Sequence, residues 1–583
     1  MFDYTFTKDP FEPVKLSGSD DYGYKLPEMS KESIEMLDPI VPPTSGIRMP
    51  IYEKSEKNYH MNSESFFRFL RVFKAVAMVG KSELKKEHPN VFICSDDRPS
   101  ADILTEHCAK IFAKEGYSIF MQDSEKQEEN SFYSRMSAPY ASATIALFDY
   151  IDIIIMITAS HNELIWNGVK FYFELPIPIS GRVMKEVSKI ALQLKEIPLE
   201  QNPKITYIDA NTKNNEYIMN LISRIIDINI LKGTKVLLWP YLGTSPEIQD
   251  LMLKLGMDVY LIDEDINPPN PTEELDSERI INTMKEQNIE IAIMLDADRD
   301  RIVFIIKDAK TGQYINLSPN ELYTSMHNIL TKNFQKKIIN VRTIPSDPRS
   351  DDSVLITYST GVGYKHLGML LYLAMGQEVE WGKLKTGILY KKIRSGYVPI
   401  QFHEEIVSDI REKNGISENV IMVSWEESGG HTFNIIDFSE KDGKIIAKSD
   451  FPLIGDKYPA PALLILTALI KMKYSLPEWI DNSIAGARTV IDADDKKKME
   501  IIQYFSQRKG QTYEISGRKY NLGTFETLEH EVDIILLKDE TSEIYFRPSG
   551  TGPNVRIYIF GKKESIQQQL ADVKQYLEEK FLK

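Results

Sequence analysis

The sequence predicts an α/β protein that ends in a C-terminal α+β module, and two patterns in the chain lead to that prediction. From about residue 90 to 310, short β-rich runs alternate with amphipathic helical stretches, and a second such cycle follows after about residue 312. Runs rich in Ile and Val on both faces are typical of parallel strands covered by helices, so this alternation indicates α/β layers. The last hundred residues instead alternate like antiparallel strands and end in a charged helix.

The individual elements follow from the same patterns in chain order. In the first cycle we expect a strand at 91–95, a helix at 101–116, and further strands at 151–157, 235–240 and 289–295. In the second cycle we expect strands at 354–359 and 420–425 and a buried helix at 461–476. For the C-terminal module we expect strands at 531–538, 543–550 and 554–561 and a helix at 565–582.

The overall composition excludes several classes of protein. A chain of 583 residues implies roughly three to five domains of about 100–200 residues each. Its 42% hydrophobic and 27% charged residues are typical of an ordinary globular protein. The net charge of −15 argues against a nucleic-acid-binding protein, although local donors can still hold a small phosphorylated ligand.

The cysteines and the apolar segments favour a cytoplasmic protein. Cys94 and Cys108 are the only cysteines, so neither a disulfide framework nor a thiolate metal site is expected. The N-terminus has no basic start followed by an apolar run, so we expect no signal peptide. Apolar stretches such as 151–157 and 461–470 are far shorter than the roughly 20 residues needed to cross a bilayer, so no membrane partner is expected.

The segment ITASHNELIWNGVK places polar side chains just beyond the end of a predicted strand. Ligands bind at that edge of open α/β sheets, and a serine there can be a covalent nucleophile if a charge or base activates it. Ser160 is therefore a candidate nucleophile. Lys170, which follows the turn signal Asn167–Gly168, is a candidate proton shuttle with a lowered pKa. The alternative is a Ser/Asn loop cap beside an exposed lysine.

The segment LDADRDR directly follows the predicted strand IEIAIML. In an extended backbone, Asp296, Asp298 and Asp300 would all project to one side. Three like charges repel one another unless a cation lies between them, and oxygen ligands favour Mg²⁺, Ca²⁺ or Mn²⁺. An EF-hand does not fit, because Arg301 and Lys307 stand where that loop needs glycine and glutamate. A solvated acidic turn is the alternative.

Later loops carry donors that suit a sugar phosphate. In SWEESGGH, Glu426 and Ser428 suit sugar hydroxyls, and the Gly-Gly pair lets a ligand approach closely. In FRPSGTGPNVR, Arg547 offers a bidentate fork, and a phosphate could be cradled by its neighbours Ser549, Gly550 and Thr551. Two weaker candidates are basic loops that contain Arg48 or the pair Lys385 and Thr386. The alternative for the phosphate loop is a Pro/Gly hairpin, and for the two basic loops it is an ordinary solvated loop.

Taken together and in this order, the motifs resemble those of the α-D-phosphohexomutase family. That family includes phosphoglucomutases, phosphomannomutases and phosphoglucosamine mutases. Its pattern has an early Thr-Ser-Gly-x-Arg, then Thr-Ala-Ser-His-Asn with a lysine ten residues past the serine. An Asp-x-Asp-x-Asp-Arg metal loop, a Gly-Glu-x-Ser-Gly sugar loop and an Arg-x-Ser-x-Thr phosphate loop follow. Here the match runs from about residue 42 to 560.

The resemblance implies three similar α/β domains and a smaller α+β domain around a central active-site cleft. Residues 1–40, which are polar and punctuated by proline, are expected to form an N-terminal extension. The expected domains are 41–205 (α/β domain I, phosphoserine loop), 206–312 (α/β domain II, metal loop), 313–478 (α/β domain III, sugar-binding loop) and 479–583 (α+β domain IV, phosphate-binding loop).

The resemblance also implies a role for each motif residue. Ser160 resembles the phosphoserine and Lys170 the general acid/base. The expected Mg²⁺ ligands are Asp296, Asp298 and Asp300, with an oxygen of phosphorylated Ser160 completing the site. Other residues expected at the catalytic centre are Arg48, His161 and Arg301. Expected substrate-binding residues are Lys385, Thr386, Glu426, Ser428, Arg547, Ser549, Gly550 and Thr551. Asp96 and Arg98 resemble a supporting structural motif.

The implied activity is that of a phosphohexomutase, which interconverts hexose 1-phosphate and hexose 6-phosphate through phosphorylated Ser160 and a bisphosphorylated sugar. The implied cofactors are one Mg²⁺ per active site and an activator of the glucose 1,6-bisphosphate type. The expected partner is a small sugar phosphate, and the chain is expected to be a monomer or a dimer. Neither nucleic acid nor membrane is an expected partner.

Three positions depart from the family's pattern and bear on the sugar. Glu163 stands where the family often has proline, Trp425 replaces the first glycine of the sugar loop, and Gly430 stands where some members have histidine. The Glu-Glu-Ser-Gly-Gly form resembles glucose- and mannose-type members, so glucose is the first expectation and mannose the second. The alternatives are a phosphoglucosamine or N-acetylglucosamine phosphate mutase, a Mg²⁺-dependent phosphatase using the same serine, and an inactive member acting as a binding or scaffold protein.

Overall fold

The structure is a computed structural model that describes residues 5–16, 20–38, 46–179, 181–377, 387–393, 396–414, 419–442, 444–527, 529–549 and 553–582. It divides into two compact units, each assembled from segments that are distant in sequence. Unit 1 contains Met1–Pro39, Ser45–Ser318 and Phe451–Tyr474. Unit 2 contains Ile40–Thr44, Pro319–Asp450 and Ser475–Lys583.

The first large sheet of unit 1 contains the strand that leads to Ser160. Its order is β12-β8-β7-β9-β10-β4, with parallel pairing from β12 to β9 and antiparallel pairing of β10 with β9 and β4. The strands are β4 (Ile47–Pro50), β7 (Asn90–Ser95), β8 (Ser118–Gln122), β9 (Ile153–Ile157), β10 (Trp166–Phe173) and β12 (Ile205–Ile208). Every residue of β9 is buried, as an Ile-rich strand covered on both faces should be.

The second large sheet of unit 1 leads to the aspartate loop. Its order is β14-β13-β15-β16-β17, and β13 lies parallel to both β14 and β15. The strands are β13 (Lys235–Pro240), β14 (Asp258–Leu261), β15 (Ile291–Leu295), β16 (Ile302–Lys307) and β17 (Tyr314–Leu317). Trp239 and Tyr241 from β13 and the chain just after it pack in the core of this sheet with Ile280 and Met284 of α8 (Ser277–Glu286).

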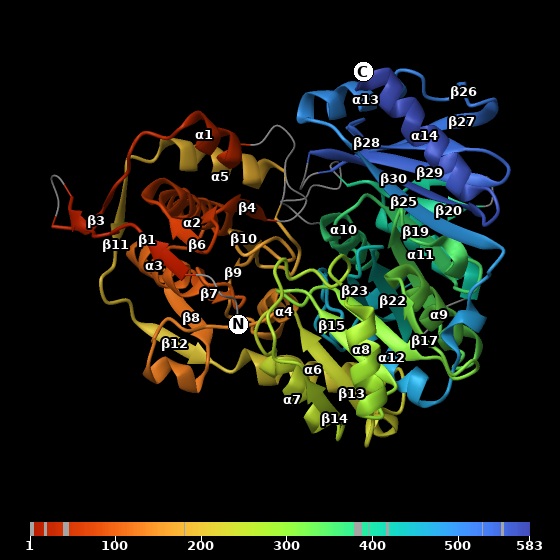
Figure 1. The fold of residues 1–583 in the computed structure, drawn as a ribbon, viewed down its shortest axis with the longest axis horizontal. Helices are drawn as coiled ribbons and strands as arrows, with labels where there is room; N and C mark the ends of the chain where they lie inside the picture. The colour runs from red at the N-terminus through yellow and green to blue at the C-terminus, as the bar shows by residue number, and fades with distance from the viewer. Residues whose placement is uncertain are drawn as a thin grey trace. The chain divides into compact units, whose positions relative to one another are not determined.

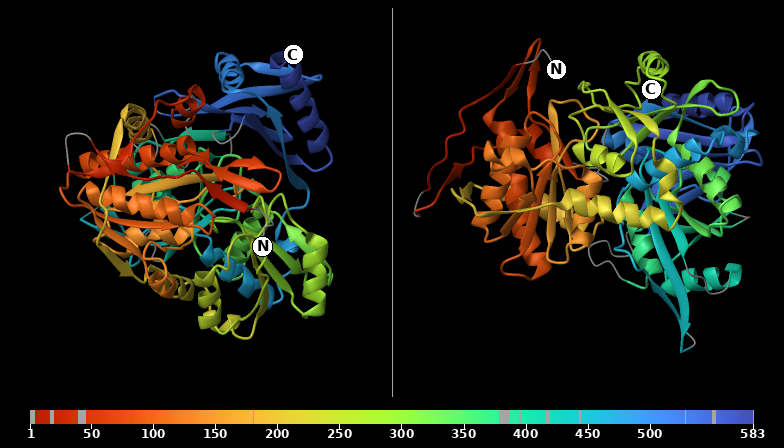
Figure 2. Two further views of the ribbon diagram at one scale, coloured as in Figure 1. Left: turned by 60° about the vertical axis from the view of Figure 1, so that its left-hand side comes forward. Right: turned by 90° about the horizontal axis from the view of Figure 1, so that it is seen from below.

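Helices and short strands complete unit 1 (Figure 1). The other helices are α1 (Lys31–Leu37), α2 (Ser63–Leu84), α3 (Ala101–Lys114), α4 (Ala138–Leu147), α5 (Arg182–Gln193), α6 (Ala210–Ser223), α7 (Pro246–Lys254) and α12 (Ala460–Lys471). The short strands form the sheets β1-β6-β5 and β11-β3-β2, built from Thr5–Lys8, Asn58–Met61, Glu53–Ser55, Glu196–Leu199, Tyr22–Lys25 and Val14–Lys15 in that order. The described parts of residues 1–40, red in Figure 2, therefore pair with later segments of the same unit.

The mixed sheet of unit 2 leads to the predicted sugar loop. Its order is β21-β20-β19-β18-β22-β23-β24, with β18 parallel to β19 and β22. The strands are β18 (Ile338–Thr343), β19 (Ile356–Thr360), β20 (Leu389–Ile393), β21 (Gly396–Pro399), β22 (Val420–Trp425), β23 (His431–Lys441) and β24 (Lys444–Lys448). The accompanying helices are α9 (Pro319–Lys332), α10 (Tyr364–Ala374) and α11 (His403–Asn414). The β23–β24 pair extends from the sheet as a hairpin (Figure 2).

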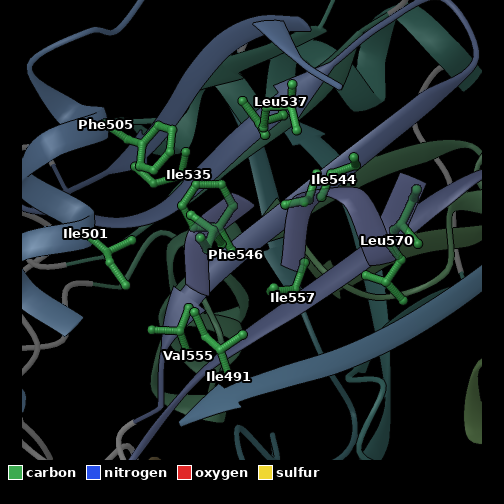
Figure 3. Packing of buried hydrophobic residues seen from close by; sticks show 14 of the residues in the cluster. Ile491, Ile501, Phe505, Ile535, Leu537, Ile544, Phe546, Val555, Ile557 and Leu570 are labelled. Carbon is green, nitrogen blue, oxygen red and sulfur yellow. The ribbon is translucent and has the colours of Figure 1, made fainter. Parts of the chain in front are cut away.

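The C-terminal part of unit 2 is an antiparallel sheet with helices against it. Its order is β25-β30-β29-β28-β27-β26, from Ile484–Asp492, Asn554–Lys562, Ser542–Pro548, Val532–Lys538, Arg518–Glu526 and Thr512–Ile515, and its helices are α13 (Asp495–Ser506) and α14 (Ile566–Phe581). Figure 3 shows the core, where Phe505 of α13 packs edge-on against Phe546 of β29 with ring centroids 4.9 Å apart. This part of the chain is the predicted α+β module.

The predicted mixed α/β fold class is confirmed, and the predicted elements are present with ends shifted by a few residues. The strand expected at 289–295 is β15, for example, and the helix expected at 461–476 is α12. The division into an extension and four domains stays a prediction. Throughout the described ranges, no helix has the length and hydropathy needed to cross a membrane.

Candidate active site

The serine and aspartate loops of unit 1 meet although they follow strands of different sheets. Ser160 lies beyond β9, and the aspartates lie beyond β15. The hydroxyl of Ser160 donates a hydrogen bond to Asp298 Oδ1 at 2.9 Å and lies 3.4 Å from Asp296 Oδ2. All three side chains are fully buried. The structure therefore brings the predicted nucleophile and the predicted metal ligands into direct contact.

The backbone at Ser160 is held in an uncommon conformation. Its φ of 56° lies in the left-handed region, which a residue other than glycine occupies only where its surroundings enforce it. The Ser160 amide donates to Thr158 Oγ1 at 2.8 Å, and the Thr158 hydroxyl donates to Asp96 Oδ2 at 2.6 Å. This local network fixes the direction in which the Ser160 hydroxyl points.

Arg98 holds the rest of the serine loop from the inside. Its Nε donates to Asp96 Oδ2 at 3.2 Å. Its two terminal nitrogens donate to loop carbonyl oxygens at 2.5–2.9 Å, namely those of Ser160, Asn162, Glu163 and Trp166. Because a guanidinium carries five N–H donors in a planar fork, one side chain can bind four carbonyls of the loop at once.

Gly168 lies in a strand, so the interpretation of Asn167–Gly168 as a turn is wrong. Both residues belong to β10, which runs antiparallel between β9 and β4. A Cβ atom at Gly168 would lie 2.5 Å from the carbonyl oxygens of Ile47 and Thr158, so only glycine allows this close approach of the backbones. Lys170 is consequently a strand residue opposite Met156, and it is buried rather than exposed.

The aspartate loop is a tight turn rather than the extended segment expected from the alternating aspartates. The carbonyl oxygen of Asp296 accepts the Arg299 amide at 3.0 Å, and Arg299 has a φ of 59°. Asp296 Oδ1 accepts the amides of Asp300 at 3.0 Å and Arg301 at 3.2 Å. The three aspartates converge because the chain curls around the first of them, which places their ligand atoms within 4.8 Å of one another.

The two arginines of the aspartate loop point to different surroundings. Arg299 is buried and forms ion pairs with Asp97 at 2.6 Å and Glu247 at 3.5 Å, which fasten the loop to neighbouring elements. Arg301 instead lies beside the carboxylates, with its Nε 3.9 Å from Asp296 Oδ2 and 3.7 Å from Asp300 Oδ1. Of the two arginines, only Arg301 lies beside the converging carboxylates.

Lys170 bridges two of the aspartates. Its Nζ lies 2.7 Å from Asp298 Oδ2 and 3.0 Å from Asp300 Oδ2. Burial acts to lower the pKa of Lys170, but the charges of Asp298 and Asp300 outweigh it and hold the pKa above its usual range. The expected lowering of this pKa is therefore wrong for the centre formed by these residues alone, because the two carboxylates together outweigh desolvation, the largest single effect.

Arg48 and His161 complete the predicted centre. Arg48 Nη1 donates to Asn162 Oδ1 at 3.3 Å, and burial lowers the pKa of the guanidinium. Burial also holds the pKa of His161 well below its usual value, and the positive charges of Arg301 and Arg48 add to that effect. His161 is therefore neutral at pH 7, next to a serine surrounded by charged groups.

The aspartate loop fits a divalent cation. Asp300 Oδ1 is buried and accepts no hydrogen bond from any residue that the structure describes. Burial and the charges of Asp300 and Asp298 raise the pKa of Asp296 well above its ordinary value, which shows the electrostatic cost of bringing these carboxylates together. Convergent carboxylate oxygens suit Mg²⁺, Mn²⁺ or Ca²⁺, and such an ion would relieve that repulsion.

The predicted sugar loop of unit 2 is a buried turn between β22 and β23. The Ser428 hydroxyl donates to Glu426 Oε1 at 2.5 Å, and the Glu426 amide donates to the Gly430 carbonyl at 3.1 Å. A layer of aromatic and histidine side chains supports the turn, in which His327 and His431 approach to 2.9 Å between their Nε2 atoms. Glu426 and Ser428 are thus held against each other within this unit.

The predicted phosphate loop of unit 2 begins at the end of β29. Arg547 is buried, with its Nε 3.6 Å from Asp533 Oδ2. The Ser549 amide donates to the Asn554 carbonyl at 2.9 Å, and the Ser549 carbonyl accepts a hydrogen bond from Lys498 at 3.0 Å. The remaining predicted substrate residues lie outside the described residues: Lys385, Thr386, Gly550 and Thr551.

Sequence reasoning missed two residues of the centre, Asp456 and Lys457. Lys457 Nζ lies 3.4 Å from Asp300 Oδ2, and Asp456 accepts a hydrogen bond from the Tyr172 hydroxyl at 2.6 Å. Burial raises the pKa of Asp456 to about 6. Both residues precede α12 in a segment that returns to unit 1 about 150 residues after the aspartate loop. No local sequence pattern indicates that return.

Comparison of the sequence with known proteins finds phosphohexomutases. Residues 41–197 match the family model "Phosphoglucomutase/phosphomannomutase, alpha/beta/alpha domain I". The phosphoglucosamine mutase of Aliarcobacter butzleri is 29% identical over 161 residues, which cover 26% of this chain and about a third (36%) of that relative's length. The phosphoglucosamine mutase of Prochlorococcus marinus is 23% identical over 424 residues, which cover 70% of this chain and 74% of that relative.

Comparison with solved structures extends the likeness in fold to nearly the whole chain. A phosphoglucomutase/phosphomannomutase family protein from Burkholderia thailandensis gives a TM-score of 0.61 at 14% identity, covering 94% of this chain and 98% of that one. The phosphoglucomutase parafusin from Paramecium gives a TM-score of 0.58 at 14% identity, covering 95% of each chain. Residues 41–197 thus match the model of domain I of this family, and the solved structures show that nearly the whole chain shares the fold of these two proteins.

Proposed function

We propose that this chain is a hexose phosphate mutase that carries the transferred phosphoryl group on Ser160. The observation that carries the proposal is the contact of a buried serine hydroxyl with Asp298 at 2.9 Å, inside a group of carboxylates bordered by Lys170 and Arg301. Phosphoryl transfer depends mainly on alignment and charge neutralisation, and this arrangement supplies both. The named relatives and neighbours, which are phosphohexomutases, support the same reaction class.

In the proposed reaction, one proton moves in the direction opposite to the phosphoryl group. The oxygen of a sugar hydroxyl forms a bond to phosphorus while the bond from phosphorus to Ser160 Oγ breaks. Lys170, whose ammonium is protonated beside Asp298 and Asp300, gives a proton to Ser160 Oγ as that bond breaks and takes up the proton that leaves the sugar hydroxyl. The sugar then carries two phosphates, and transfer of the other phosphate to Ser160 completes the interconversion of hexose 1-phosphate and hexose 6-phosphate.

Asp296, Asp298 and Asp300 would hold the cation, which we propose to be Mg²⁺, one per active site. When bound, it would neutralise negative charge on the phosphoryl oxygens. The chain's own residues do the remaining work. Arg98 and Thr158 fix the serine loop, and the buried setting keeps water away from the phosphorylated serine. A sugar bisphosphate of the glucose 1,6-bisphosphate type would load Ser160 initially.

The residues of unit 2 are proposed to recognise the substrate. Glu426 and Ser428 would bind sugar hydroxyls, since both carry hydrogen-bonding groups on one short turn. Arg547 and Ser549 would bind the phosphate that is not being transferred, with Gly550 and Thr551 in the same loop. Lys385 and Thr386 are proposed as further substrate contacts. These roles rest on the resemblance of the motifs to the family pattern.

Glucose phosphate is the proposed substrate, with mannose phosphate second, because of the Glu-Glu-Ser-Gly-Gly form of the sugar loop. A specific observation favours a second candidate. The curated relatives with matched sequence are named phosphoglucosamine mutases, and the Prochlorococcus marinus protein aligns over 70% of this chain. Glucosamine phosphate is therefore the alternative substrate, and only a direct comparison of sugars separates the two.

A mutase assay tests the proposal. Purified protein with Mg²⁺ and a trace of glucose 1,6-bisphosphate would be offered the 1-phosphates of glucose, mannose, glucosamine and N-acetylglucosamine. We expect a 6-phosphate product from glucose or mannose 1-phosphate with little release of inorganic phosphate. Release of phosphate as the main product would identify a phosphatase instead, and no conversion of any of the four sugars would reject the mutase proposal.

A further inference from the structure

Lys457 is a second lysine at the serine–aspartate centre, and no motif in the sequence pointed to it. Its Nζ lies 3.4 Å from Asp300 Oδ2, the same oxygen that Lys170 contacts at 3.0 Å. It arrives on the segment Phe451–Tyr474, which belongs to unit 1 although the sequence before and after it belongs to unit 2. The chain thus returns to this centre and places a cation there.

The residues on both sides of Lys457 are anchored. Asp456 is buried and accepts the Tyr172 hydroxyl at 2.6 Å, and Tyr172 lies on β10, two residues beyond Lys170. Tyr458 is fully buried and donates its hydroxyl to Asn214 Oδ1 at 2.7 Å. The backbone on both sides of Lys457 is anchored, and from it the side chain reaches Asp300. Its position is therefore a consequence of the fold rather than of a mobile surface side chain.

The two lysines meet the carboxylates in different ways. Lys170 is the more deeply buried, with 7% of its side chain exposed, and bridges Asp298 and Asp300. Lys457 is 16% exposed, like Arg301, so both lie toward the more open side of the centre. Its 3.4 Å separation from Asp300 is longer than the roughly 2.7–2.9 Å of a close charge-assisted hydrogen bond. Lys457 therefore meets Asp300 as an ion pair rather than as a close hydrogen bond.

A phosphorylated Ser160 would add a stronger anion to this centre. A phosphoryl group on serine carries about −1.5 to −2 charge at pH 7 and three strong acceptor oxygens. Ser160 Oγ already contacts Asp296 and Asp298, so this charge would be added beside existing carboxylates. The charge of Lys457 reaches this neighbourhood, because it acts on His161, the residue after Ser160, as well as on Asp296.

We propose that Lys457 is a catalytic residue whose ammonium group donates a hydrogen bond to the phosphoryl group as that group moves between Ser160 and the sugar. This inference rests on the proposed function and adds a residue to it. Lys457 forms no covalent bond and gives up no proton. It supplies a fixed positive charge next to the phosphoryl oxygens, where it lowers the cost of placing that group among the aspartates.

The test measures how fast Ser160 becomes phosphorylated, which does not depend on the preferred sugar-phosphate substrate. Unphosphorylated full-length protein is mixed with Mg²⁺ and glucose 1,6-bisphosphate, and the gain of roughly 80 Da is followed by intact mass spectrometry. Lys457→Met keeps the length of the side chain and removes the charge. We expect it to slow the gain about 10- to 100-fold, as expected for losing one charge-assisted hydrogen bond. Lys457→Arg restores the charge and should stay within about threefold of the wild type.

Lys473→Met is the matched control. Lys473 lies in the same segment but on the surface, where it is 61% exposed and pairs with Glu290 at 2.6 Å. Its removal should leave the rate unchanged. Equal rates for the wild type and Lys457→Met would overturn the proposal for Lys457 while leaving the mutase intact. A wild type that gains no mass would instead reject the proposed function itself.

Titration with Mg²⁺ alone separates a catalytic role from a structural one. Removing a cation that contacts Asp300 cannot weaken the attraction of the carboxylates for Mg²⁺, so Lys457→Met should bind Mg²⁺ at least as tightly as the wild type by calorimetry. Binding weakened more than about tenfold would mean that the aspartate loop had been disturbed, and the proposal would fall. Should Lys457→Met not fold, Lys457→Gln and Lys457→Arg provide the same comparison of a neutral with a charged side chain.

Discussion

Replacing Arg98 by lysine should loosen the serine loop selectively. The guanidinium donates to four loop carbonyls and to Asp96, and all these partners lie in unit 1. A lysine keeps the charge near Asp96, but its single ammonium cannot reach carbonyls arranged around a planar fork. At least two of these hydrogen bonds are lost, and hydrogen bonds from a charged donor are worth about 1.5–3 kcal/mol each. We expect the loop to open more easily by about 3–6 kcal/mol.

Hydrogen exchange monitored by mass spectrometry measures this opening directly. Amides protected by the loop structure exchange through local opening, so 3 kcal/mol corresponds to exchange roughly 100-fold faster. The relevant peptide spans residues 156–170, in which the Thr158 amide donates to Gly168 and the Ser160 amide to Thr158. Because Ser160 would no longer be held at its left-handed φ, its phosphorylation by glucose 1,6-bisphosphate should slow as well.

Arg182→Lys provides the control for a general effect of replacing arginine. Arg182 is 64% exposed and pairs with Glu83 at the surface of the same unit, where such a pair contributes about 0–1 kcal/mol. This variant should exchange like the wild type in the 156–170 peptide. If Arg98→Lys exchanged less than about fivefold faster than the wild type, the fork of Arg98 would not be what holds the loop.

Three further substitutions test other parts of the account. Burial raises the pKa of Asp456 to about 6, above the roughly 3.9 of an unfolded aspartate. The protonated residue therefore favours folding most below pH 4, and about 3 kcal/mol of that effect is lost as the pH rises through 6 to about 7. Urea titrations at several pH values should show the free energy of unfolding of the wild type falling, as the pH rises, relative to that of Asp456→Asn. A difference that does not change with pH would contradict this. Asp300→Asn should weaken Mg²⁺ binding at least tenfold by calorimetry, whereas the exposed Glu290→Gln should not. Tyr558→Phe removes the hydroxyl that donates to buried Glu427 at 2.9 Å and should destabilise unit 2 by about 1–3 kcal/mol in urea, so an unchanged midpoint would refute that contact.

The sequence was most informative where a buried strand ends in polar residues. The Ile-rich run before Ser160 and the apolar run before Asp296 predicted β9 and β15, and each strand delivers its motif at its end. Hydrophobic patterning determines strands of this kind locally, so the prediction needed no knowledge of the rest of the fold. The contact between Ser160 and Asp298 joins two sheets, and only the combined set of motifs suggested it.

Other features depended on contacts between distant segments. The turn at Asp296 replaced the expected extended segment because backbone amides bind its carboxylate. Gly168 looked like a turn residue, whereas its role is to let three backbone segments approach closely. The direction of the pKa shift of Lys170 depends on two ion pairs with residues about 130 positions away. None of these effects leaves a local pattern in the sequence.

Lys457 shows most clearly what a single sequence does not predict. The apolar helix after it was predicted and is α12, but the prediction placed it with the second α/β cycle. Whether a helix packs on one sheet or another depends on which apolar surfaces match, and a single sequence does not reveal that. For the same reason the short N-terminal strands, which pair with Asn58–Met61 and Glu196–Leu199, were not expected within residues 1–40.

The central claim is that Ser160 carries the phosphoryl group, and the mass of the intact protein tests it most directly. Wild type and Ser160→Ala would each be treated with Mg²⁺ and glucose 1,6-bisphosphate and then weighed, with peptide fragmentation to locate any adduct. The account predicts a gain of roughly 80 Da on Ser160 in the wild type and no gain in Ser160→Ala. A phosphoryl group that persists in Ser160→Ala, or that lies on another residue of the wild type, would contradict it.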